Sequence, residues 1–283
     1  METVAPATGK LRELQLAETQ ILCDFARFCD ENGLTYYIHS GTLLGAVRHG
    51  GFIPWDDDID VIMPYEDYKK FLEIGQRGMG EDYFIQTSDT DKNYYRYYAR
   101  IRRNNTTYID KNNLNWDIHH GVWIDVFPMM EVNPGLDFKI KQTLIRAGNC
   151  ILMDNFLEAR MESYKVKGSL FISLMRKFYK ISYERRKRWK DKVEKLVLSG
   201  KNKKCYSYVW MSVTFCWDKK LTDEKTKIEF EGHEFVVPKD YKKMLELNYK
   251  KWWELPPEDQ RIGHGLETII DLENNYTKYT KNQ

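Results

Sequence analysis

WDDDIDVIM occupies residues 55–63, and this stretch decides the fold more than any other. From Asp58 onward acidic and aliphatic residues alternate, which predicts a β-strand over residues 58–63. Because strand side chains alternate between two faces, Asp56, Asp58 and Asp60 should share one edge. Carboxylates that converge in this way suit a hard divalent cation, either Mg²⁺ or Mn²⁺.

A third acid stands in a similar frame at residues 121–128, Gly-Val-Trp-Ile-Asp-Val-Phe-Pro. The pattern predicts a second strand, closed by Pro128, with Asp125 between apolar neighbours. Burying a lone acid there is costly unless it is paired or coordinates a metal. We therefore expect Asp58, Asp60 and Asp125 to be catalytic and to hold the metal together.

Gly41 and Thr42 lie sixteen residues before Asp58, between a predicted strand at residues 34–39 and a predicted helix near residues 43–48. Glycine lets the backbone approach a phosphate closely, and Thr42 and the amides at a helix start can donate to phosphate oxygens. This order of elements, followed by the Asp-x-Asp strand and a distant third acid, is a nucleotidyltransferase layout. In such sites metal ions promote phosphoryl transfer.

Three other structures are compatible with an acidic run of this kind. A solvated surface loop does not explain the aliphatic alternation or the second frame at Asp125. A calcium loop would need Gly where Val61 stands and Glu where Asp67 stands. A glycosyltransferase with a DxD metal motif is the serious rival, but it explains neither Asp125 nor the Gly-Thr pair.

Basic, histidine and aromatic residues supply weaker candidates. Arg48 and Arg102 are expected to bind the donor phosphates, because a guanidinium matches phosphate geometry. His49, Arg100 and Arg103 could join that clamp. The lower-ranked site candidates, each more often structural, are His39, Asp56, His120, His264, Trp55 and Trp123. Rings that could cage a cation, or simply fill the core, are Trp55, Trp116, Trp123, Tyr94, Tyr95, Tyr97 and Tyr98.

The predicted elements indicate an α+β protein. Helices are expected at residues 10–31, 65–75 and 241–253, strands at 94–102 and 106–110, and a hairpin at 228–237. Residues 1–133 are predicted to form a nucleotidyltransferase-like catalytic core with a mixed sheet. Residues 134–224 form a helical basic region, and residues 225–283 complete the catalytic domain.

Composition narrows the class of protein. The 283 residues carry a net charge of +2, with 42% hydrophobic residues, which is typical of a globular chain. The five cysteines are an odd number without a CxxC pair, which argues against a disulfide framework and a zinc site. The first residues lack the apolar core of a signal peptide, so a cytoplasmic protein is expected.

The basic charge is concentrated between Arg160 and Lys204, with 16 Lys+Arg against 4 Asp+Glu, a net of +12. Apolar residues recur at helical spacing from Ser169 to Trp189, and a basic run, residues 185–188, lies near its end. Such a helix can lie on an anionic membrane surface, bind a polyanionic acceptor, or simply pack on the core. Nucleic acid is not expected as a partner, because no nucleic-acid motif is present.

The long string YIHSGTLLGAVRHGGFIPWDDDIDV at residues 37–61 resembles the LicD family. Further similar segments are Arg100-Ile-Arg102 with Thr106-Thr107, the stretch from His120 to Pro128, and Phe235-Val-Val-Pro238 leading to Leu255-Pro-Pro257. The family includes bacterial phosphorylcholine transferases and animal fukutin-type ribitol-phosphate transferases. The animal members' zinc-binding cysteine cluster has no counterpart here, which favours the bacterial branch.

The resemblance implies a nucleotidyltransferase-like fold, Mg²⁺ dependence and transfer of a phosphorylated alcohol from a CDP donor to a glycan hydroxyl. Asp58, Asp60 and Asp125 match the family's metal-binding acids, and Asp125 could also help deprotonate the acceptor. CDP-choline is the expected donor, and teichoic acid or lipopolysaccharide, possibly lipid-linked at the inner face of the membrane, the expected acceptor. A ribitol- or glycerol-phosphate transferase, a glycosyltransferase and an inactive glycan-binding relative stay open as alternatives.

Overall fold

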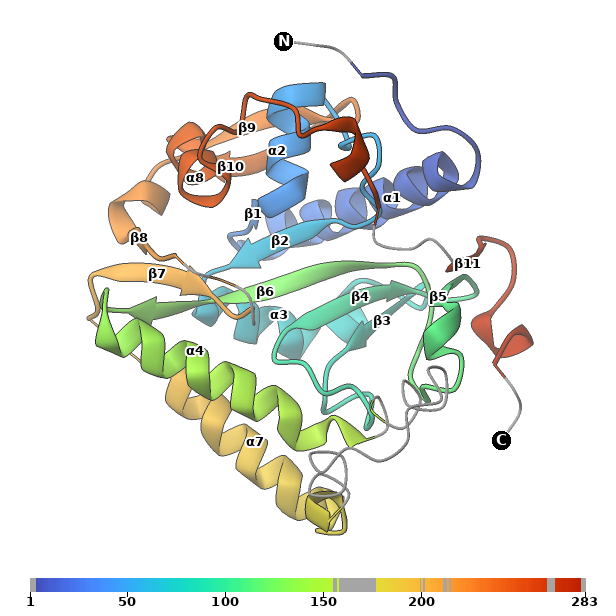
Figure 1. Cartoon of the computed structure of the whole chain (residues 1–283), viewed down its shortest axis with the longest axis vertical. Helices are drawn as coiled ribbons and strands as arrows, with labels where there is room; N and C mark the ends of the chain where they lie inside the picture. The colour runs from blue at the N-terminus through green and yellow to red at the C-terminus, as the bar shows by residue number, and fades with distance from the viewer. Residues whose placement is uncertain are drawn as a thin grey trace.

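The computed structural model describes residues 4–154, 157, 177–198, 200, 202–210, 213, 215–263 and 268–280. Within these ranges a mixed β-sheet is covered by helices (Figure 1). Seven of the described strands belong to this sheet, whose main path runs β1-β2-β6-β4-β3. The predicted α+β class with a mixed-sheet core is confirmed.

Helix α1 (Gly9–Asn32) brings an apolar stripe to the core. Leu14, Ile21 and Phe25 recur at helical spacing and are fully buried. The helix ends at Gly33, whose φ of 63° is a left-handed conformation that carries no Cβ penalty in glycine. The predicted helix over this stretch is confirmed, one residue wider at each end.

The next elements are β1 (Tyr37–Ile38), α2 (Ser40–His49) and β2 (Asp60–Met63). The strand predicted at residues 34–39 therefore shrinks to two residues, and the helix predicted near residue 43 begins earlier. The strand predicted over residues 58–63 begins only at Asp60, so the expectation that Asp56, Asp58 and Asp60 share one strand edge was wrong. Pairing with β1 reaches only Val61 and Ile62, and pairing with β6 starts at Asp60, so the preceding acids lie in a loop.

Strand β6 (Trp123–Val132) is central in the sheet. It pairs parallel with β2 and antiparallel with β4 (Ala99–Arg103) and β7 (Cys205–Tyr208). The prediction that Pro128 closes this strand was wrong. Pro128 stands where pairing with β2 ends and pairing with β7 begins at Met129, so its missing N–H costs little there.

The connection from β2 to β6 contains α3 (Tyr65–Gly78), β3 (Tyr83–Gln86), β4 and β5 (Thr107–Asp110). The helix predicted at residues 65–75 and the strand predicted at residues 106–110 are confirmed. The strand predicted from Tyr94 begins only at Ala99. All four tyrosines before it are buried, so burial does not alternate there as it does on a strand facing solvent on one side.

Helices α4 (Leu136–Asn149) and α7 (Tyr183–Leu198) lie side by side along one edge of the molecule (Figure 1). The helix predicted from Ser169 to Trp189 falls partly outside the described residues. Its described part is interrupted, because the Ser182 carbonyl accepts from the Arg185 and Arg186 backbone N–H groups at 3.1 Å and starts a new helix.

Strand β7 joins the main sheet, although it comes from the predicted helical basic region, residues 134–224. The two-residue strand β8 (Trp217–Asp218) pairs with it. The proposed division at residues 133 and 224 stays a prediction.

The C-terminal part contributes β9 (Lys225–Phe230), β10 (His233–Pro238), α8 (Tyr241–Tyr249) and β11 (Thr268–Asp271), which pairs with β5. The predicted hairpin is confirmed, and its turn residues Glu231 and Gly232 both have positive φ, as a type I′ turn requires. Helix α8 ends four residues before the predicted Trp253, since Lys250 adopts a φ of 53°.

Short 3₁₀ turns occupy Lys111–Asn113, Cys150–Leu152, Lys219–Thr222, Glu258–Gln260 and Tyr276–Lys278. None of the helices in the described ranges combines the length and the apolar character that a membrane crossing requires.

Candidate metal and donor site

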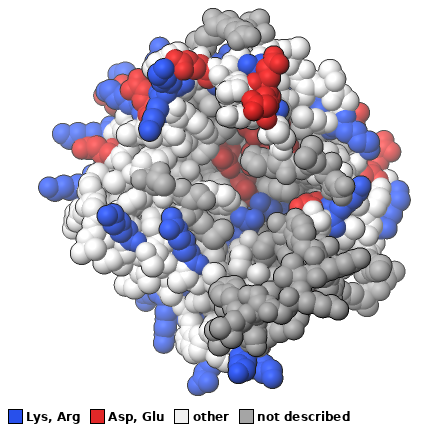
Figure 2. All heavy atoms as spheres, viewed as in Figure 1, with Lys and Arg blue, Asp and Glu red and all other residues white. Residues whose placement is uncertain are grey.

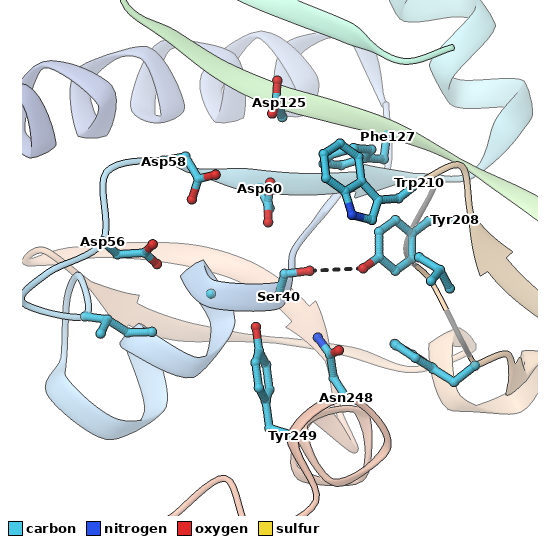
Figure 3. Close-up of a pocket in the computed structure, with 14 residues that line it drawn as sticks. Ser40, Asp56, Asp58, Asp60, Asp125, Phe127, Tyr208, Trp210, Asn248 and Tyr249 are labelled. Carbon is cyan, nitrogen blue, oxygen red and sulfur yellow. Dashed lines mark hydrogen bonds between the residues drawn. The ribbon is translucent and has the colours of Figure 1, made fainter. Parts of the chain in front are cut away.

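Three carboxylates from separate positions converge at one end of β2 and β6. Asp60 is the first residue of β2 and pairs in register with Asp125 of β6. Asp58 lies in the loop just before β2. One carboxylate oxygen from each of these acids lies within 4.8 Å of the other two (Figure 3).

This cluster fits a divalent cation. Burial and the neighbouring charges of Asp58 and Asp125 raise the pKa of Asp60 well above its ordinary value. Like charges held so close cost free energy unless a cation neutralises them. Oxygen ligands alone, converging from three positions, are the set that Mg²⁺ or Mn²⁺ prefers. The three acids predicted from the sequence to share one metal are thus brought together.

Arg100 of β4 orients Asp125. Its Nε donates to one carboxylate oxygen at 2.6 Å and its Nη2 donates to the other at 3.3 Å. Both side chains are buried. The Trp123 ring covers the guanidinium, 4.2 Å from its centroid, and stacks on Tyr108 at 4.3 Å. Of the arginines singled out in the sequence, Arg100 is therefore the one that reaches the acids.

Arg102 lies on the same face of β4 but behind the site. Its guanidinium donates to the Gln86 side chain at 2.8 Å and to the Gly121 carbonyl at 2.7 Å. It forms no ion pair with a carboxylate in the described part of the chain. Burial and the charge of Arg100 lower the pKa of Arg102 to about 9. Its contacts are those of a buried structural side chain, and its role in phosphate binding stays a prediction.

The first residues of α2 line the same cavity as the acids. A Cβ added to Gly41 would lie 2.6 Å from Oδ2 of Asp56, so any larger residue would push that carboxylate away. The Thr42 hydroxyl accepts a hydrogen bond from the Asp60 backbone N–H at 2.9 Å and ties α2 to β2. Ser40 has a φ of 47°, and a strained backbone of this kind is common at functional sites.

A cavity of about 400 Å³ opens above these residues. In Figure 2 acidic side chains are visible at the base of a hollow near the centre of the face. Besides the acids and the start of α2, the cavity is lined by Ile53, Phe127, Tyr208, Trp210, Val213, Phe215, Asn248 and Tyr249. Figure 3 shows Trp210 and Tyr208 on one side of Ser40 and Asp56 on the other.

Sequence reasoning missed the aromatic and amide residues of this lining. Phe127 lies on β6 beside Asp125, and the others come from β7, the loop after it and α8, more than 80 residues away from Asp125 in the chain. The only available signal was the family-like segment leading into α8. Of the rings proposed to cage a cation, Trp116, Tyr94, Tyr95, Tyr97 and Tyr98 are buried and do not line the cavity, and the half-buried Trp55 and Trp123 do not line it either.

The acidic loop rests on buried polar groups of other elements. Gln15 of α1 donates to the Asp56 carbonyl at 2.9 Å, and the Tyr108 hydroxyl donates to the Asp57 carboxylate. Glu18 is fully buried beneath the loop, and neither of its oxygens has a hydrogen-bond partner among the described residues. Burial and the charge of Asp58 raise the pKa of Glu18 well above its ordinary value. The protein thus accumulates carboxyl groups here.

Several candidates lie away from the cavity lining. Arg48, at the far end of α2, donates to the Trp252 and Glu254 carbonyls at 3.4 and 3.2 Å. His39 is buried against the Tyr208 and Trp217 rings.

The remaining candidates have contacts of their own. His120 contacts the Trp116 carbonyl at 2.6 Å through its Nε2. Trp55 lies under Arg261, 5.8 Å from the ring centroid. Burial lowers the pKa of both His39 and His120 to about 3. His264 lies outside the described residues, so its predicted role is untested.

Comparison with known proteins agrees with this geometry. Residues 33–146 match the family described as LicD/FKTN/FKRP, nucleotidyltransferase domain. The chain is 28% identical over 275 residues to the lipopolysaccharide cholinephosphotransferase LicD of Haemophilus influenzae, covering 93% of this chain and 98% of the relative.

Two eukaryotic proteins match over shorter stretches. Mannosyltransferase regulator 4 of Saccharomyces cerevisiae is 29% identical over 124 residues, 41% of this chain and 10% of its own length. Human ribitol 5-phosphate transferase FKRP is 51% identical over 35 residues, 12% of this chain and 7% of its own. The matched domain contains all three converging acids, so residues 33–146 are similar to the LicD/FKTN/FKRP nucleotidyltransferase domain at the positions that form the site.

Proposed function

We propose that this phosphotransferase moves phosphocholine from CDP-choline to a hydroxyl of a cell-surface glycan, teichoic acid or lipopolysaccharide, and releases CMP. The observation that carries the proposal is the convergence of Asp58, Asp60 and Asp125 at one end of a cavity. The similarity to a lipopolysaccharide cholinephosphotransferase over nearly the whole chain supports the choice of head group.

In the proposed reaction the acceptor oxygen forms a bond to the phosphorus that carries choline. The bond from that phosphorus to the CMP oxygen breaks, CMP leaves with the electron pair, and the acceptor proton passes to a carboxylate of the cavity. Mg²⁺, when bound, would neutralise charge on the transferring phosphoryl group and on the departing oxygen.

The chain's own residues hold and orient the reactants. Asp58, Asp60 and Asp125 are the proposed ligands of the cation, and Arg100 fixes the orientation of Asp125 through two hydrogen bonds. We expect the α2 start at Gly41 to approach the donor phosphates closely, since no side chain stands there. The hydrogen bond between the Thr42 hydroxyl and the Asp60 backbone N–H holds the start of α2 next to Asp60.

A donor panel tests the proposal. CMP release is measured in Mg²⁺ with CDP-choline, CDP-ribitol and CDP-glycerol, and UMP or UDP release with a UDP-sugar, each with lipopolysaccharide or teichoic acid. We expect turnover with CDP-choline. Turnover with a polyol donor or the UDP-sugar alone would replace the proposal by a polyol-phosphate transferase or a glycosyltransferase. Acceptor binding without any product would indicate an inactive glycan-binding relative.

We also propose that the enzyme works at the cytoplasmic face of the membrane on lipid-linked acceptors. Helices α4 and α7 expose Leu136, Ile140, Trp189 and Leu196 together with Lys139, Arg146, Arg185, Arg188, Lys192 and Lys195. Apolar side chains among cations favour an anionic lipid surface. Of the basic run at residues 185–188, Arg186 is buried on Asp154 and Lys187 pairs with Asp89 and Asp191.

Vesicle flotation tests this contact. Arg185→Gln with Arg188→Gln should weaken binding to anionic vesicles, because each basic residue near such a surface contributes about 1 kcal/mol. The matched control is Lys239→Gln, which removes an exposed cation that directly follows β10 and forms an ion pair with Glu224. Equal recovery with anionic and zwitterionic vesicles would contradict membrane docking.

A further inference from the structure

We infer that the aromatic end of the cavity, formed by Phe127, Tyr208, Trp210 and Phe215, is the subsite that selects a quaternary ammonium head group. The inference rests on the proposed function, because it takes the donor phosphates to lie at the acidic end of the same cavity. It adds what that function does not specify, namely the residues that distinguish choline from a neutral alcohol.

The four rings come from two strands and a loop and contact one another. The Phe127 centroid lies 5.6 Å from both the Tyr208 and the Trp210 centroids, with the rings edge to face. Phe215 lies 6.3 Å from Tyr208. The Tyr98 ring packs against Phe127, with the two ring centroids 4.3 Å apart. The wall is therefore fixed by packing, which lets it bind a ligand without first being ordered.

Charge favours a cation at this end. The cavity lining includes the carboxylates of Asp56, Asp58, Asp60 and Asp125, and it contains no Lys or Arg among the described residues. Arg96 stacks on Trp210, 5.6 Å from the ring centroid, but does not itself line the cavity. A positively charged head group gains from the ring quadrupoles, and a neutral polyol does not.

Hydrogen bonding also favours choline over a polyol at this end of the cavity. A trimethylammonium group has no donor or acceptor, whereas each hydroxyl of a ribitol or glycerol chain needs a partner when it is buried. Phe127 and Phe215 offer none, and the Tyr208 hydroxyl already shares a 3.4 Å hydrogen bond with Ser40 (Figure 3). A polyol hydroxyl placed against the Phe127 and Phe215 rings would stay unpaired, and a trimethylammonium group there would not.

The decisive probe is the neutral isostere of choline, 3,3-dimethylbutanol, which replaces nitrogen by carbon and keeps the shape. Binding of phosphocholine and of 3,3-dimethylbutyl phosphate to the full chain in Mg²⁺ is measured by calorimetry. KM is measured with the two corresponding CDP esters. The wild-type protein should prefer the charged compound about 10-fold in both measurements, within the range of a cation on an aromatic wall.

Substitutions in the aromatic end of the cavity test which residues cause the preference for the charged compound. Trp210→Leu and Phe215→Leu should each reduce the preference to below about 3-fold, raise KM for CDP-choline and leave kcat nearly unchanged, while Trp210→Phe should keep most of it. The control is Trp253→Leu, a tryptophan 48% exposed and outside the cavity, which should behave as wild type.

Equal binding of the charged and neutral phosphates by the wild-type protein would overturn the subsite, even if CDP-choline is turned over. A preference that survives in both leucine variants would overturn it as well. Absence of CMP release from every donor would refute the proposed function instead, and the calorimetric preference would still decide whether the rings bind a quaternary ammonium.

Discussion

Gly41→Ala should impair turnover without unfolding the protein. The new Cβ would stand 2.6 Å from Oδ2 of Asp56, whereas ordinary contact begins at 3.4 Å, so the carboxylate must move by 3.4 − 2.6 = 0.8 Å. The obstructing atom is the end of a side chain, and alanine in a helix gains about 0.5–1 kcal/mol over glycine, so stability should be kept. A shift near 1 Å in a reacting site costs on the order of 10²-fold in rate.

The assay is CMP release from CDP-choline in saturating Mg²⁺, with thermal unfolding measured on the same samples. We compare the wild type, Gly41→Ala, Asp56→Ala and the double variant in a cycle, because the two positions touch. If the steric effect acts through Asp56, the double variant should be no slower than Asp56→Ala alone.

Two results would refute this reasoning. Gly41→Ala with near-wild-type kcat would mean that the position of Asp56 is unimportant. A double variant much slower than Asp56→Ala would mean that the Cβ obstructs the donor directly rather than through the carboxylate.

Arg100→Gln should lower the free energy of unfolding by about 3 kcal/mol in urea titrations, because it leaves Asp125 buried without its cation, whereas the exposed Arg27→Gln should cost less than about 1 kcal/mol. Acid should destabilise the fold through His120: its pKa falls from 6.5 to about 3 on folding, so the unfolded chain binds more protons below pH 6.5. The loss should reach about 2 kcal/mol at pH 5, from 1.5 pH units at about 1.36 kcal/mol each, and a His120→Gln variant should show a shallower slope between pH 6.5 and 5. Asp60→Asn should raise the Tm in EDTA by relieving carboxylate repulsion and abolish the Tm increase that Mg²⁺ gives the wild type; an unchanged Mg²⁺ effect would contradict its role as a ligand.

The sequence predicted the acid cluster because its signal is local. An acid flanked by aliphatic residues on a strand needs a partner wherever the strand lies. Asp60 and Asp125 could therefore be assigned to one metal site without knowing how their strands pair. The structure then pairs these two residues directly across β2 and β6. The exact strand start was missed, because it depends on where pairing with β6 begins, which no local pattern encodes.

Tertiary contacts decide which arginine reaches the acids and which aromatic rings line the cavity. Arg100 and Arg102 share one face of β4, and only the register Arg100↔Asp125 decides which one reaches the acid. Tyr208 enters the cavity because β7 pairs with the end of β6 that lies beyond Pro128. Proline was read as a strand end, so the continuation that receives β7 could not be predicted.

The most direct test of the central claim is CMP release from CDP-choline in Mg²⁺ by Asp58→Asn, Asp60→Asn and Asp125→Asn, beside the exposed control Asp82→Asn. Each substitution keeps the size of the side chain and removes a negative ligand. We predict that each of the three lowers kcat by on the order of 10³-fold while the control keeps wild-type turnover. Folded Asp58→Asn and Asp60→Asn proteins that release CMP at near-normal rates would contradict the account.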